Sequence, residues 1–420
     1  MSIKYRLILM NFLQFFIWGS WLITIGAYWF QNKAWSGAEF GAIFSTMGIA
    51  SVFMPALAGI IADRFINAEK LYGIMHLLAA GVLFYLPQVE DPKTFFWVIL
   101  LNMIFYMPTI SLSITVAYTA LKSENKDVIK DYPPIRIWGT IGFIAALWVV
   151  SLTHNETSSN QFYIAAATSL LLGIYAFTMP KCPPSYTKEN SKSFVEALGL
   201  KAFTLFKDSR FAVFFIFSML LGAALQLTNA YGDTFIHDFK NVPEYQNLLA
   251  VKYPAIIMSI SQISETLFIL AIPFFLRKFG IKQVMVFSML AWVFRFGLLA
   301  YANPAGGLWM IILSCIVYGM AFDFFNISGS LFVETRTDHT IRGSAQGLFM
   351  MMVNGFGALI GSYASGIIIQ KYFTNADNTK DWQGIWLCFA GYALILAIIF
   401  PLVFKYKHDP KEVAAVPAGH

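Results

Sequence analysis

The sequence predicts an all-α membrane protein with twelve transmembrane helices. Of its residues 58% are hydrophobic and only 12% are charged, whereas soluble domains carry about 25% charged residues. The mean hydropathy is +0.62, and long apolar runs such as 385–404 are interrupted by isolated polar residues rather than by clusters of charge. This pattern is typical of helices packed inside a bilayer, so lipid is the predicted solvent.

Polar breaks divide the chain into twelve apolar stretches, each near the ~20 residues that a helix needs to cross hydrocarbon. They are 5–31, 37–62, 71–89, 94–121, 135–153, 161–180, 211–236, 250–276, 283–302, 306–333, 343–370 and 383–404. The first follows Lys4 and Arg6 and is too long for a signal-peptide core, so we expect it to remain uncleaved. The fifth begins at Pro133 and Pro134, residues tolerated in the first turn of a helix.

The longest polar insert follows the sixth stretch and divides the spans six and six. We therefore predict an N-terminal six-helix half over 1–180, a cytoplasmic linker over 181–210, a C-terminal six-helix half over 211–405 and a cytoplasmic tail over 406–420. With the N-terminus in the cytoplasm, 21 of the 29 Lys and Arg residues lie in cytoplasmic segments and 6 in external ones. This positive-inside bias predicts that both termini are cytoplasmic. It also accounts for the net charge of +6 without nucleic acid as a partner.

Two charged loops repeat between the halves. Gly59, Asp63, Arg64 and Lys70 follow the second span, and Arg277, Lys278, Gly280 and Lys282 follow the eighth. Parallel halves with substrate bound between them near the midplane are the plan of the major facilitator superfamily. The first loop resembles that superfamily's signature G-x-x-x-D-R-x-G-R-K, although its second part differs. We interpret Asp63, Arg64, Arg277 and Lys278 as inner gates or hinges.

Only two acidic residues, Glu265 and Asp323, fall well inside predicted spans. A charge at the bilayer centre costs roughly 3 kcal/mol on insertion scales, so such residues normally face a wet cavity or a partner. Glu265 follows Gln262 by three residues and therefore shares its helical face, and Gln226 and Asn229 repeat this spacing. These amides favour binding of a polar solute. The alternative is that they only tie helices together.

The tenth span carries Tyr318, Phe322 and Asn326 at i, i+4 and i+8, with Asp323 beside this stripe. The two rings offer flat faces for a ligand, although aromatic residues at helical spacing more often serve packing.

The fifth span presents Arg136, Thr140 and Phe143 on one face. Arg136 has two interpretations, a role at the inner mouth of a cavity or snorkelling to the headgroups. Arg295, near the outer end of the ninth span, is interpreted as snorkelling or packing and is left out of the site.

The sequence gives no support to an enzyme, a metal site or a cofactor. The three cysteines have no paired spacing, and neither a nucleophile triad nor a phosphate loop nor a metal-ligand cluster occurs. His76 lies in the third stretch without an acidic neighbour, and His237 sits at an external helix end. Both are interpreted as structural, with a proton relay as the alternative.

Several long stretches carry a family resemblance. They are FLQFFIWGSW (12–21), FMPALAGIIAD (53–63), PPIRIWGTIGF (133–143), FFIFSMLLGA (214–223), SISQISETLFIL (259–270), VYGMAFDFFNISGS (317–330), SAQGLFMMMVNGFG (344–357) and FKYKH (404–408). In these stretches the chain resembles the bacterial nucleoside:proton symporter family of the major facilitator superfamily. The resemblance implies proton-driven uptake of purine or pyrimidine nucleosides across the bacterial inner membrane.

The resemblance also implies a ligand set. The positions that match the family's nucleoside-binding residues are Arg136, Thr140, Phe143, Gln226, Asn229, Gln262, Glu265, Tyr318, Phe322 and Asn326. Asp323 is implied as a residue of proton coupling or conformational control.

The expected mechanism is alternating access, in which protonation of Glu265 or Asp323 favours an occluded state. The choice between the two carboxylates stays open. We expect a monomer. The alternatives are a major facilitator for another polar solute, such as a sugar, and a transporter-like membrane sensor.

Overall fold

The structure is a computed structural model that describes residues 2–126, 128–184, 200–337 and 341–406. The described secondary structure is almost entirely helical, with one isolated β-bridge between Thr374 and Lys380. Nine of the described helices are long and apolar enough to cross a membrane. The prediction of an all-α membrane protein is therefore confirmed.

The described residues form two compact units. One takes in residues 2–35, 46–126 and 128–184, and the other takes in residues 36–45, 200–337 and 341–406. The predicted linker and tail lie partly outside the described residues, at 185–199 and 407–420.

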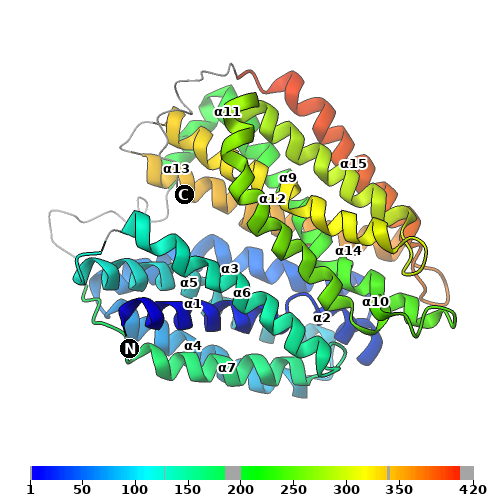
Figure 1. Cartoon of the computed structure of the whole chain (residues 1–420), viewed down its shortest axis with the longest axis horizontal. Helices are drawn as coiled ribbons and strands as arrows, with labels where there is room; N and C mark the ends of the chain where they lie inside the picture. Colours follow the sequence, from blue (N-terminus) through cyan, green and yellow to red (C-terminus); the bar gives the residue numbers. More distant parts are fainter. Residues whose placement is uncertain (1, 127, 185–199, 338–340, 407–420) are drawn as a thin grey trace. The chain divides into compact units, whose positions relative to one another are not determined.

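The helices of the first unit run in chain order (Figure 1). They are α1 (Ile3–Gly19), α2 (Ile25–Ala27), the π-helix η1 (Tyr28–Asn32), α3 (Gly37–Arg64, whose first residues belong to the second unit), α4 (Ala68–Tyr85), η2 (Leu86–Gln88), α5 (Pro92–Ser123), α6 (Val128–Leu152) and α7 (Asn160–Ala176). In this unit α1 packs on α6, and α4 packs on α5 and α7.

The helices of the second unit are η4 (Leu200–Lys207), α9 (Ser209–Asp238), η5 (Phe239–Asn241), α10 (Leu249–Lys252), α11 (Pro254–Tyr301), α12 (Leu308–Arg336), α13 (Arg342–Met350), the π-helix η6 (Met351–Gly357), α14 (Ala358–Tyr372) and α15 (Trp382–Val403). Here α11 packs on α12 and α15, and α9 packs on η6 and α14.

Small residues set the closest helix contacts. A Cβ atom on Gly142 of α6 would meet the backbone of Phe12 on α1, and one on Gly222 of α9 would meet the backbone of Val353 in η6. Close backbone approach at glycine is a common way for membrane helices to associate, because lipid gives helices little hydrophobic reason to pair. These contacts fix α6 and α9, the helices that carry several of the predicted ligand residues.

Two details differ from the simplest interpretation of the apolar stretches. The first stretch, 5–31, is not one helix: α1 ends at Gly19, and the chain turns before α2 and η1 begin. By contrast α11 contains two predicted stretches in one 48-residue run, broken only at Gly280, where φ is 79° and ψ is 167°. Glycine suits this point because a positive φ costs other residues about 1–2 kcal/mol.

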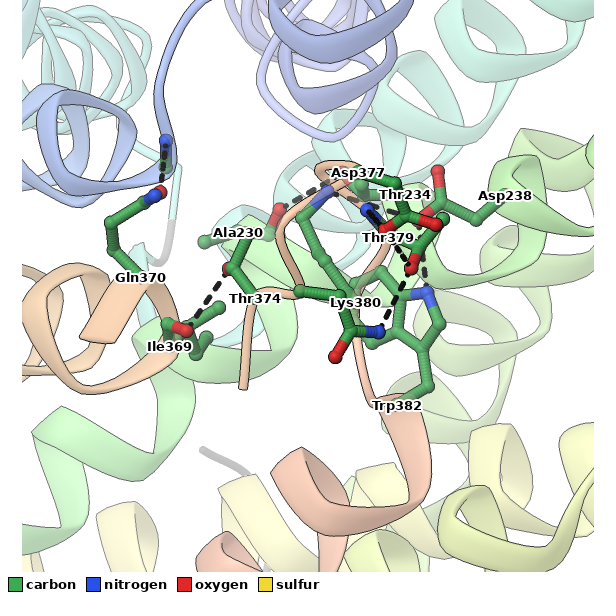
Figure 2. Close-up of polar contacts among 12 residues, drawn as sticks. Ala230, Thr234, Asp238, Ile369, Gln370, Thr374, Asp377, Thr379, Lys380 and Trp382 are labelled. Atoms are coloured by element: carbon green, nitrogen blue, oxygen red, sulfur yellow. Dashed lines mark hydrogen bonds and ion pairs between the residues drawn. The ribbon is translucent and has the colours of Figure 1, made fainter. Parts of the chain in front are cut away.

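The loop between α14 and α15 is tied to the end of α9 (Figure 2). The Trp382 indole donates to Asp238 Oδ2 at 2.9 Å, and Lys380 Nζ lies 3.8 Å from the same oxygen. Within the loop, hydrogen bonds from Thr379 hold the pKa of the Asp377 carboxyl below its usual value. Burial lowers the pKa of Lys380. The loop is therefore an ordered element of the second unit.

Candidate functional site

Arg136 stands on the face of α6 that packs against α1. Its Cζ lies 4.2 Å from the centroid of the Phe15 ring, close enough for a cation–π contact. A Cβ atom on Gly139 would collide with both the guanidinium and that ring, so the glycine makes room for the stack. Arg136 and Thr140 are half-buried, and Phe143 is buried. The guanidinium is thus held against an aromatic ring of α1, a placement that snorkelling does not require.

Gln226 on α9 is the most informative amide of the second unit. Its side chain is 1% exposed, and neither its Nε2 nor its Oε1 atom has a hydrogen-bond partner among the described residues. Buried polar groups are nearly always paired, so an unpaired one calls for an explanation. An amide can donate and accept at once, which suits a ligand with both functions. Asn229, three residues on, is half-buried.

Glu265 lies where α11 and α12 approach most closely. A Cβ atom on Gly319 of α12 would meet the backbone of Ser264 and Glu265. The Ser264 hydroxyl also donates to the Ile316 carbonyl across the same junction. Glu265 and Gln262 are both half-buried. Gly319 thereby brings Glu265 to the part of α12 that carries Tyr318.

The aromatic stripe of α12 borders a small pocket inside the second unit. Tyr318 and Phe322 have nearly parallel rings, 7° apart in plane with centroids at 6.0 Å. Phe322 and Asn326 line the pocket, together with Leu221, Leu225, Trp292, Ala321, Phe325 and Val353. Asn326 donates to the Phe322 carbonyl at 3.1 Å, which leaves its amide oxygen available. The lining of the pocket is therefore mostly apolar, with the Asn326 amide as its polar group.

Asp323 is the buried carboxylate of α12. It is 5% exposed, and its Oδ2 atom has no hydrogen-bond partner among the described residues. A buried carboxylate is expensive to keep charged inside a membrane helix, which makes Asp323 a candidate for a group that binds a proton.

The four residues interpreted as inner gates are all exposed. Asp63 and Arg64 end α3, and Arg277 and Lys278 lie just before the break at Gly280. Lys278 Nζ lies 5.6 Å from the Phe274 ring centroid.

His76 is fully buried within the first unit and has neutral partners. Its Nε2 lies 2.8 Å from Gln14 Oε1, and its Nδ1 lies 3.3 Å from Ser169 Oγ. Gln14 also accepts from Tyr72 and donates to Thr109. This network joins α1, α4, α5 and α7, which favours the structural interpretation of His76.

A family model described as nucleoside H+ symporter matches residues 1–409. The chain belongs to the nucleoside H+ symporter family. Its relatives include the xanthosine permease of Escherichia coli strain K12, 54% identical over 98% of both chains. They also include the nucleoside permease NupG of the same strain, 52% identical over 100% of this chain and 99% of the relative.

Solved structures agree with this family assignment. Two crystal structures of nucleoside transporter NupG are 51% identical in sequence; the one of a D323A mutant has a TM-score of 0.93 and covers 96% of this chain and 100% of that one. The other has a TM-score of 0.91 and covers 97% and 100%. A bacterial homologue of the human lysosomal transporter Spinster, 12% identical, shares the fold with a TM-score of 0.69 over 98% of this chain and 97% of its own.

The sequence interpretation of this family member missed buried charges. Arg295 does not snorkel: it is fully buried, so packing is the correct alternative. The sequence did contain a signal for this burial: helical spacing places Arg295 on the same face as Ser288, Trp292 and Leu299, which are also buried. Asp233, near the end of the seventh predicted stretch, is buried in α9 with its Oδ2 3.4 Å from His237 Nε2.

Proposed function

We propose that the protein carries nucleosides into the cell together with protons by alternating access. Membership of the nucleoside H+ symporter family over residues 1–409 is the observation that carries this proposal. The unpartnered Gln226 amide and the buried Asp323 carboxylate support it, because they supply a polar ligand contact and a proton-binding group in one unit.

Ten residues form the proposed nucleoside site. They are Arg136, Thr140, Phe143, Gln226, Asn229, Gln262, Glu265, Tyr318, Phe322 and Asn326. The aromatic rings would stack on the nucleobase, and the amides would bind base edges and ribose hydroxyls. Asp323 and Glu265 are the proposed coupling acids, and Asp63, Arg64, Arg277 and Lys278 are the proposed inner gates.

The proposed topology has twelve spans in two six-helix halves with both termini in the cytoplasm. Nine described helices qualify by length and composition. The 17-residue helices α1 and α7 are one turn or less below a full crossing, and the break at Gly280 divides α11 into two arms. Counting α1, α7 and both arms of α11 as spans supports the proposed twelve. The positive-inside distribution supports the orientation in the inner membrane.

Proton binding by a carboxylate would couple the gradient to transport. Protonation removes the cost of burying the charge and favours the occluded state, and release of the proton to the cytoplasm favours opening there. One proton moving down ~100 mV supplies about 2.3 kcal/mol, enough for roughly fifty-fold accumulation of a neutral nucleoside. This magnitude suffices for scavenging.

Uptake of radiolabelled uridine and adenosine into proteoliposomes tests the proposal. The intact protein is compared with Glu265→Gln and Asp323→Asn, and with Asp208→Asn as a control at an exposed acid that pairs with Arg210 at 2.9 Å. We expect gradient-driven uptake by the intact protein and the control. Loss of gradient-driven uptake with retained exchange in one variant identifies the coupling acid. No nucleoside uptake by the intact protein under any gradient would refute the proposed substrate.

A further inference from the structure

Arg295 is a buried cation held by neutral groups. It lies on the second arm of α11 and is 0% exposed. None of the ion pairs found among the described residues includes it. A charged side chain inside a membrane helix is costly, and buried charges in such helices usually mark functional positions. Its contacts therefore indicate what it does.

The guanidinium joins three helices. Its Nε donates to Thr228 Oγ1 on α9 at 3.2 Å, and its Nη1 donates to the Ser314 carbonyl on α12 at 2.7 Å. Its Cζ lies 4.7 Å from the centroid of the Tyr318 ring, within cation–π range. All three contacts belong to the second unit.

Each contact adjoins a residue of the proposed nucleoside site. Thr228 lies between Gln226 and Asn229 on α9, and Ser314 is one helical turn before Tyr318. The Tyr318 ring also meets the edge of Trp292, a pocket residue, with centroids 6.0 Å apart at 90°. Arg295 thus contacts Tyr318 of the proposed site and two residues close to its other members, and it is not among the residues that line the pocket.

We propose that Arg295 is a positioning residue for nucleoside binding: held by the Thr228 hydroxyl on α9, its guanidinium fixes the Tyr318 ring. The inference rests on the proposed function and deepens it by assigning a role to a residue outside the ligand set. Arginine suits this role because its planar group donates in two directions while stacking on a ring. The compact ammonium group of lysine keeps the charge but reproduces neither the fork nor the stack.

The test is a double-mutant cycle on uridine affinity, measured by calorimetry on the purified intact chain. Arg295→Lys and Thr228→Val are made alone and in a Tyr318→Leu background. The control Arg210→Lys changes an arginine of the same unit that is 54% exposed. We expect Arg295→Lys to raise the Kd about tenfold, Thr228→Val about threefold and the control less than about twofold. In the Tyr318→Leu background the first two effects should fall below about twofold.

The same loss of affinity in both backgrounds, or no loss from either variant, overturns the positioning role. A purely structural residue would lower thermal stability and leave the Kd of the folded fraction unchanged, which also overturns it. If Arg295→Lys does not fold, the Thr228→Val cycle decides, because that change removes one hydrogen bond at nearly constant shape. Failure of the intact protein to bind any nucleoside refutes the proposed function and this inference together, whereas binding with additive variants refutes the inference alone.

Discussion

Replacing Gln226 by methionine should stabilise the empty protein and weaken nucleoside binding. The Gln226 amide is 1% exposed and has no hydrogen-bond partner among the described residues. A buried unsatisfied polar group costs about 1–3 kcal/mol, so its removal at similar volume should return part of that amount. If the nucleoside satisfies this amide, the same change should raise the Kd about 5- to 150-fold.

Gln14 provides a matched control for this substitution. It is also fully buried, but its amide binds Thr109, Tyr72 and His76 at 2.6–2.8 Å. Gln14→Met strands these partners and should therefore lower the melting temperature, the opposite of the effect at Gln226.

Thermal unfolding of both variants in detergent, with and without saturating uridine, measures stability and ligand response together. In the Gln226 variant the melting temperature of the empty protein should rise and its increase on adding uridine should shrink. A Gln226 variant that is destabilised as much as the Gln14 variant, with unchanged uridine affinity, would refute the reasoning.

Two further predictions concern packing and thiol chemistry. Gly222→Ala should lower the melting temperature, because its new Cβ meets the Val353 carbonyl. Gly391 has open space around it, so Gly391→Ala should leave the free energy of unfolding unchanged or raise it by up to about 1 kcal/mol. Differential scanning fluorimetry compares the two variants, and equal destabilisation contradicts the packing. Burial, reinforced by the negative charge of Glu69, raises the pKa of the Cys182 thiol to about 11. Its thiolate fraction at pH 8 is then about 100-fold below that of a free cysteine, so N-ethylmaleimide should modify Cys182 slowly, and faster as the pH rises. Because Cys388 is exposed, the label is located by peptide mapping, and rapid labelling of Cys182 in the folded protein at pH 8 contradicts this prediction.

Helix positions could be predicted where polar breaks coincide with helix ends. The stretch 306–333 corresponds to α12, Leu308–Arg336, because Arg336 and the residues after it cannot remain in hydrocarbon. The first stretch failed because hydropathy continues through 20–24, where the backbone turns. Hydropathy measures transfer to lipid and carries no information on where a continuous apolar segment bends.

The candidate site, too, could be predicted from the sequence only in part. Spacing brought Gln226 with Asn229 and Tyr318 with Phe322 onto common faces, since a single helix determines this. Spacing could not show that Arg295 turns inward, because its partners Thr228 and Ser314 lie on other helices. The roles of the proposed ligand residues remain predictions that the binding experiments test.

The break at Gly280 has a consequence for how the chain enters the membrane. A straight helix of 48 residues would be about 72 Å long, more than twice the ~30 Å of hydrocarbon that it must cross. The break at Gly280 divides this run into two arms, 254–279 and 281–301, each near the ~20 residues of one crossing, so the chain can enter the membrane as two spans. The second arm carries Ser288 and Arg295, whose side chains donate to the Ala321 and Ser314 carbonyls of α12, so this arm is the one that these two hydrogen bonds hold in place.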